Sequence, residues 1–135
     1  MLVMPTGAGK TLTVIRWLFD SFYLKKIDIQ VLWLSHRKEL LDQAFLTAQN
    51  EKIRSNLSRI EIIPFYGYIS AYRDQMVDEG NLFLSSSRLA FNNLDELQKR
   101  SFDLVIVDEA HHASASTLEY NKLLSELRYK ILLGV

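Results

Sequence analysis

The sequence contains no cysteine, which excludes disulfide bonds, thiolate metal sites and thiol nucleophiles. Its longest apolar runs, such as LVIV and VLWL, are far shorter than the ~20 residues of a membrane-spanning helix. Its first residues lack the charged segment and apolar block of a secretory signal peptide. Together these absences predict a cytoplasmic protein in a reducing compartment, with no membrane partner.

The chain also lacks a net charge, because 16 basic residues balance 16 acidic ones. This balance gives no general argument for nucleic-acid binding, so any such contact has to be argued from local sites. With 48% hydrophobic and 24% charged residues, the composition is that of an ordinary globular protein. The length of 135 residues predicts a single domain, residues 1–135, with a buried core.

Short β-rich runs alternate with segments of helical periodicity along the chain. The alternation predicts an α/β fold, a mostly parallel sheet with helices on both faces. Ligands of such sheets bind at the carboxyl ends of the strands, and the candidate chemical residues directly follow expected strands. The expected strands are 2–4, 31–35, 59–65, 81–86, 102–110 and 130–135, and the expected helices are 10–23, 37–50, 71–78, 87–93 and 116–128.

The segment PTGAGKT has the glycines of a phosphate-binding loop. Gly7 and Gly9 let backbone amides approach a ligand closely, and the following helix adds its N-terminus to the anion site. Lys10 would reach the β- and γ-phosphates of a nucleotide, and Thr11 would give its hydroxyl to Mg²⁺. Met4 stands where the strict motif has its first glycine. The alternative interpretation is a glycine-rich turn without a ligand.

The segment LVIVDEAHH carries two carboxylates to the end of a buried-type strand. Asp108 would hold Mg²⁺ through its water shell, because this ion prefers carboxylate and water ligands. Glu109, one residue further, would polarise the attacking water. A solvated acidic turn is the alternative when the segment is taken alone. Zinc at His111 and His112 is disfavoured, because adjacent histidines point in different directions and cysteine ligands are absent.

These two segments resemble motifs I and II of superfamily 2 helicases and translocases. The resemblance is greatest to the branch that holds the motor subunits of type I and type III restriction enzymes and related DEAD/DEAH-box repair helicases, where the position of Met4 is often not glycine. VLWLSHRKELLDQA resembles motif Ia, LFLSSSRLAF lies where motif Ib would, and ILLGV resembles the approach to motif III. The resemblance therefore spans almost the whole chain.

The resemblance implies a P-loop NTPase (RecA-like) domain, the first motor domain only, and a role for each matching residue. His111 would couple the nucleotide site to the second motor domain; a histidine satisfied by local hydrogen bonds is the alternative. For the motif Ia and Ib residues the alternatives are a solvated helix start and a plain helix cap. The implied catalytic residues are Lys10, Asp108, Glu109 and His111; the nucleotide-binding residues are Pro5, Thr6, Gly7, Ala8, Gly9, Lys10 and Thr11; Thr11 and Asp108 serve Mg²⁺; and Ser35, His36, Arg37, Ser86, Ser87 and Arg88 contact nucleic acid.

The expected function is the nucleotide-binding half of a nucleic-acid-dependent ATPase, a helicase, translocase or restriction motor that uses ATP and Mg²⁺. DNA is favoured over RNA as its partner, and nuclease or restriction-complex subunits are further candidates. The family's arginine finger comes from a second RecA-like domain, which this chain lacks, so we expect it to be part of a larger protein and to hydrolyse ATP poorly by itself. The alternatives are a P-loop ATPase or kinase that does not act on nucleic acid, and a binding module without catalysis.

Overall fold

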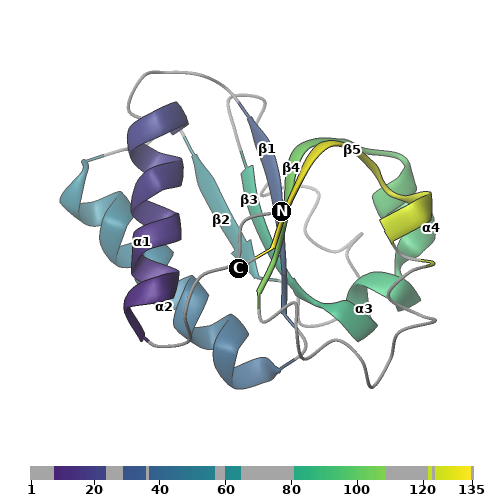
Figure 1. The fold of residues 1–135 in the computed structure, drawn as a ribbon, viewed down its shortest axis with the longest axis horizontal. Coiled ribbons are helices and arrows are strands. Elements are labelled where there is room, and N and C mark those ends of the chain that lie inside the picture. Colours follow the sequence, from purple (N-terminus) through teal and green to yellow (C-terminus); the bar gives the residue numbers. More distant parts are fainter. Residues whose placement is uncertain are drawn as a thin grey trace.

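A computed structural model describes residues 8–23, 29–35, 37–56, 60–64, 81–108, 122 and 124–134. Five parallel strands form one sheet in the order β2-β3-β1-β4-β5. In chain order the elements are α1 (Ala8–Leu18), the π-helical segment η1 (Phe19–Tyr23), β1 (Gln30–Ser35), α2 (Lys38–Arg54), β2 (Glu61–Pro64), β3 (Asn81–Ser86), α3 (Ser87–Asn92), α4 (Leu94–Gln98), β4 (Ser101–Val107) and β5 (Arg128–Gly134) (Figure 1).

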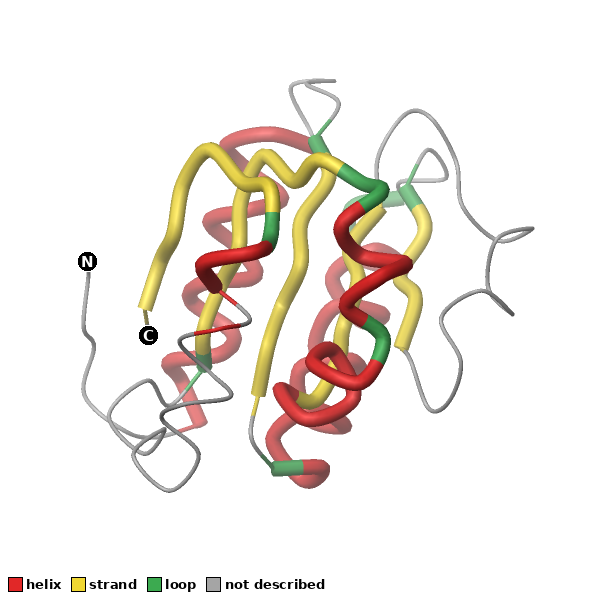
Figure 2. Tube along the Cα trace, turned by 90° about the vertical axis from the view of Figure 1, so that its right-hand side faces the viewer, coloured by secondary structure: helices red, strands yellow, loops and turns green. Residues whose placement is uncertain are grey.

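The sheet lies between two helical layers, with α1 and α2 on one face and α3 and α4 on the other (Figures 1 and 2). Side chains of β1 alternate between these layers: Val31 and Trp33 join the core under α1 and α2, whereas Leu32 and Leu34 join the core under α3 and α4. All four are fully buried. Strands covered on both faces need apolar residues at every position, which explains the continuous run VLWL.

The predicted fold class is therefore confirmed. The structure gives β3 the predicted limits, 81–86, and it contains α4, a five-residue helix that the sequence reading missed. The predicted helix 116–128 is wrong at its end, because Arg128 already pairs with Ser101 in the sheet. The predicted strand 2–4 and helix 71–78 lie outside the described residues. Within the described part of the chain, no helix is long and apolar enough to span a membrane.

Four polar residues form a row near the amino ends of four neighbouring strands. Asn81 donates its side-chain amide to Oε1 of Gln30, at 2.7 Å. The backbone N–H of Gln30 donates to Oδ2 of Asp103, at 2.8 Å. The ammonium of Lys130 lies 3.2 Å from the other oxygen of Asp103. This polar row therefore links β3, β1, β4 and β5 by side-chain contacts at one level of the sheet.

Candidate functional site

Three predicted site residues, two for nucleic acid and one for Mg²⁺, come together at the carboxyl edge of the sheet. Ser35 and Ser86 end β1 and β3 and are partners in the strand register. Asp108 directly follows β4 and continues its pairing with β1, because its backbone N–H donates to the carbonyl of Leu34 at 2.8 Å. The parallel pairing thus places Ser86, Ser35 and Asp108 side by side, as expected for a site in an open α/β sheet.

Lys10 and Asp108 form a buried ion pair at this edge. Nζ of Lys10 lies 3.1 Å from Oδ1 of Asp108, and the two side chains are only 4% and 1% exposed. Among the described residues, neither carboxylate oxygen of Asp108 has an aligned hydrogen-bond donor, so the contact with Lys10 is chiefly electrostatic. A buried carboxylate normally receives such donors. Asp108 therefore has hydrogen-bonding capacity that the described part of the protein leaves unused.

Lys10 reaches Asp108 from the first turn of α1, which begins at Ala8. Thr11 lies in the same turn and is buried. The first N–H groups of an α-helix have no partners within it and carry a partial positive charge, and the first turn of α1 contains no acidic residue that would compensate it. The ammonium, these N–H groups and the hydroxyl of Thr11 make a setting that suits a phosphate group.

Several predicted site residues lie outside the described part of the chain. They are Pro5, Thr6 and Gly7 of the loop, His36 of the motif Ia segment, and Glu109 and His111 after β4. The structure describes the backbone of Ala8 and Gly9, which open α1, but not their surroundings.

The two described site residues of the motif Ia segment differ in exposure. Ser35 is buried, and its hydroxyl donates to the carbonyl of Arg37 at 3.3 Å. Arg37 is exposed at the N-cap of α2, where its side chain makes no capping hydrogen bond. Of these two residues, Arg37 has the side chain that an external anion can reach.

The motif Ib segment divides in a similar way. Ser86 is the N-cap of α3, since its Oγ accepts a hydrogen bond from the backbone N–H of Leu89 at 3.1 Å. This bond uses an acceptor lone pair and leaves the hydroxyl proton available to a second partner. Ser87 is buried, and Oγ has no hydrogen-bond partner among the described residues. Arg88 is exposed. The accessible polar groups of this segment are therefore those of Ser86 and Arg88.

The chain resembles a known protein family and solved structures with a similar fold. The family model described as "Type III restriction enzyme, res subunit" matches residues 1–135. The chain belongs to this family. The resemblance predicted from motifs I and II is thereby confirmed, and the parallel sheet is the fold that its structural neighbours share.

The chain spans less than a fifth of the length of each of the following proteins that it matches. It is 28% identical over 130 residues to the "Putative ATP-dependent helicase IRC3" of Saccharomyces cerevisiae, a match covering 93% of the chain and 17% of that protein. The fold is similar to that of a nuclease-deletion mutant of the type ISP restriction-modification enzyme LlaGI in complex with a DNA substrate mimic, with a TM-score of 0.71, 18% identity and coverage of 99% and 15%. For the ATP-dependent type ISP enzyme LlaBIII bound to DNA, the TM-score is 0.67, the identity 17% and the coverage 98% and 11%.

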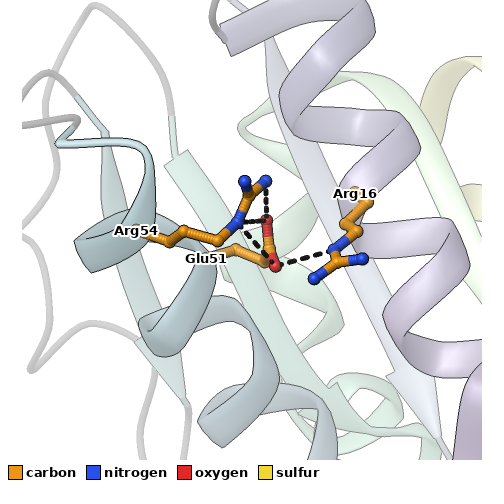
Figure 3. Close-up of polar contacts among 3 residues, drawn as sticks. All are labelled: Arg16, Glu51 and Arg54. Atoms are coloured by element: carbon orange, nitrogen blue, oxygen red, sulfur yellow. Dashed lines mark hydrogen bonds and ion pairs between the residues drawn. The ribbon is translucent and has the colours of Figure 1, made fainter.

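The structure also contains a buried carboxylate that was not predicted from the sequence. Glu51 of α2 is 3% exposed and accepts hydrogen bonds from two arginines (Figure 3). Arg54 donates through Nη2 and Nε to Oε2, at 2.8 and 3.1 Å, and Arg16 of α1 donates through Nε to Oε1, at 3.0 Å. The Arg54 guanidinium lowers the pKa of Glu51, burial opposes this shift, and Arg16 lowers the pKa further.

A signal for this residue was present in the sequence. Ala44 and Ala48 of α2 are buried, and Glu51 follows them at helical spacing on the same face. An acidic residue on an apolar stripe requires a partner when it is buried. The predicted helix ended at residue 50, one position before it, so the anomaly was not visible.

Proposed function

We propose that this chain is the nucleotide-binding half of a nucleic-acid-dependent ATPase motor. The observation that carries the proposal is the buried ion pair of Lys10 and Asp108, 3.1 Å apart at the carboxyl edge of a parallel sheet. Two opposite charges held out of water cost desolvation energy that packed apolar residues would avoid. Such a pair is expected where a ligand uses both groups, the cation for phosphate and the carboxylate for a metal ion.

The residues present fit a magnesium ion. Asp108 has two buried carboxylate oxygens without aligned donors in the described structure, and Thr11 lies in the same helical turn as Lys10. Oxygen ligands of this kind suit Mg²⁺, with Asp108 acting through water. When bound with a nucleotide, the ion would neutralise charge on the transferring phosphoryl group. We assign Asp108 and Thr11 to hold it.

The other catalytic steps fall to groups of this chain. Lys10 and the backbone N–H groups of residues 6–11 would orient the phosphates and stabilise their charge. Glu109 would accept a proton from, or orient, the attacking water. His111 would pass the state of the nucleotide to a second motor domain. That domain would supply the arginine of the transition state, and we therefore expect the chain by itself to bind Mg²⁺–ATP weakly and to hydrolyse it poorly.

The proposed nucleic-acid contacts lie at the same carboxyl edge of the sheet as the proposed nucleotide site. The exposed Arg37 and Arg88 and the hydroxyl of Ser86 suit sequence-independent contacts with a phosphate backbone. Ser35 and Ser87 are buried in this structure and would serve by shaping the edge. His36 belongs to the same proposal. DNA is the favoured nucleic acid, since LlaGI and LlaBIII are each described with DNA.

The test compares nucleotide binding by matched lysine variants. Binding is measured by calorimetric titration with Mg²⁺–ATP. Lys10→Ala should weaken binding by at least about tenfold, because a charge-assisted contact to phosphate is lost. Lys99→Ala is the control, since Lys99 is exposed and pairs with Glu96 of α4. Equal affinities of wild type and Lys10→Ala would refute the nucleotide site.

A second measurement separates the motor from a P-loop ATPase or kinase that does not act on nucleic acid. Arg37→Ala should weaken binding of a labelled oligothymidylate at low salt and leave Mg²⁺–ATP affinity unchanged. In a protein that also contains the second domain, Glu109→Gln should spare nucleotide binding and stop hydrolysis. Hydrolysis that survives Glu109→Gln would contradict the role given to that residue.

A further inference from the structure

The buried Glu51 takes no part in the nucleotide chemistry described above, yet it contacts both helices of its layer. Its carboxylate lies between Arg54 of the same helix and Arg16 of α1, 35 positions earlier in the chain (Figure 3). Arg54 would suffice to neutralise it, because this arginine forms a two-nitrogen contact within α2. The bond to Arg16 is therefore additional to charge compensation, and what it adds is a fixed link between α1 and α2.

Apolar side chains of α1 and α2 pack together in one core and set how the two helices cross. The free energy of burying them is itself non-directional, so a directional contact adds to what packing provides. A hydrogen bond between a guanidinium and a carboxylate is directional. The Arg16–Glu51 bond therefore favours one position of α1 along α2. The negative charge of Asp20, just beyond α1, also raises the pKa of Arg54 after the larger effect of Glu51. Charges of alternating sign thus connect the two helices.

Each helix carries a different part of the proposed site. α1 begins with Lys10 and Thr11, which would bind the phosphates and serve Mg²⁺. α2 begins directly after Arg37, which would contact the nucleic acid. Arg16 lies five residues after Thr11, roughly 8 Å along a rigid helix at the usual rise. A displacement of α1 on binding nucleotide would therefore reach α2 through the Arg16–Glu51 bond.

We propose that Glu51 and Arg16 are positioning residues that transmit nucleotide binding at the start of α1 to the nucleic-acid edge at the start of α2. The inference rests on the proposed function. It predicts that Mg²⁺–nucleotide and single-stranded nucleic acid change each other's affinity by a factor that depends on the Arg16–Glu51 bond. Coupling of this kind commonly amounts to about 5- to 150-fold.

The experiment measures the dissociation constant of a fluorescein-labelled oligothymidylate with and without saturating Mg²⁺–AMP-PNP. The ratio of the two constants is the coupling factor. Arg16→Gln is the main variant, because it breaks the link between helices and leaves Glu51 paired with Arg54 inside α2, so the fold is retained. Arg16→Lys keeps the charge, and Lys99→Gln is the control for loss of a positive charge, since Lys99 is exposed and lies outside α1 and α2.

Wild type and Lys99→Gln should show a coupling factor of at least about 5. Arg16→Gln should bind each ligand alone within about twofold of wild type but have a coupling factor near 1, and Arg16→Lys should recover part of it. A purely structural role would leave the coupling factor unchanged, so equal factors in wild type and Arg16→Gln overturn the inference. A wild type that binds both ligands without coupling also overturns it and leaves the proposed function intact. A wild type that does not bind Mg²⁺–AMP-PNP overturns both.

Discussion

Removal of either charge of the Lys10–Asp108 pair should destabilise the chain, and removal of both should restore it. Lys10→Met leaves Asp108, 1% exposed, without its cation and without an aligned donor among the described residues. A buried ion pair that loses one partner typically costs 3–5 kcal/mol, and we expect about 3 kcal/mol here. Asp108→Asn should cost a similar amount, because it removes the carboxylate charge that lies 3.1 Å from the buried Lys10 ammonium.

The double variant Lys10→Met/Asp108→Asn contains no charge at this position. Its free energy of unfolding should lie within about 1 kcal/mol of wild type, the remaining loss coming from an unpaired amide. The entropy of unfolding of a chain of 135 residues is about 280 cal/mol/K. Each single variant should therefore lower the melting temperature by about 10 °C, and the double variant by only about 4 °C.

Urea unfolding followed by tryptophan fluorescence measures these differences, since Trp33 is fully buried in the core. Lys99→Met is the control, an exposed lysine whose replacement should change the free energy of unfolding by less than about 0.5 kcal/mol. The prediction is refuted if the losses in free energy of unfolding of the two single variants add in the double variant, because additivity means that the charges do not stabilise each other. It also fails if Lys10→Met is as stable as wild type.

Two further predictions concern the helices. Above pH 4.5, wild type should be more stable than Glu51→Gln. This advantage should shrink as the pH falls through the lowered pKa of Glu51, because protonation removes the charge that both arginines bind. An advantage that is constant across this range would contradict the ion-pair role. Ser86→Ala should lower the free energy of unfolding by about 1 kcal/mol by removing the cap of α3, whereas Thr47→Ala, in the middle of α2, should not destabilise. Equal effects in denaturant titrations would argue against the cap.

The sequence predicted the strands well because burial on both faces leaves a strong signal. β1 and β3 each contain a continuous apolar run, and the serines at their carboxyl ends mark where they end. The same reasoning predicted that Asp108 would lie at the carboxyl edge of the sheet. It missed α4, whose five residues are too few for a helical period to show.

Contacts between distant residues could not be predicted in the same way. The partner of Glu51 on α1 lies 35 positions away, and only the packing of the two helices brings it near. The lack of aligned donors around Asp108 is likewise a property of the assembled edge and not of the segment LVIVDEA. Local pattern therefore predicted which residues follow the strands, and tertiary packing decided which charges meet.

The polar row at the amino ends of the strands has a consequence for how this chain tolerates changes in length. Asn81, Gln30 and Asp103 each lie five residues before the residue that their strand presents at the opposite edge, namely Ser86, Ser35 and Asp108. A one-residue insertion or deletion between the two ends of β1, β3 or β4 would break that equality. It would also turn the following side chains to the other face of the sheet. Single-residue length changes inside these strands should therefore be far less tolerated than changes in the loops that connect them.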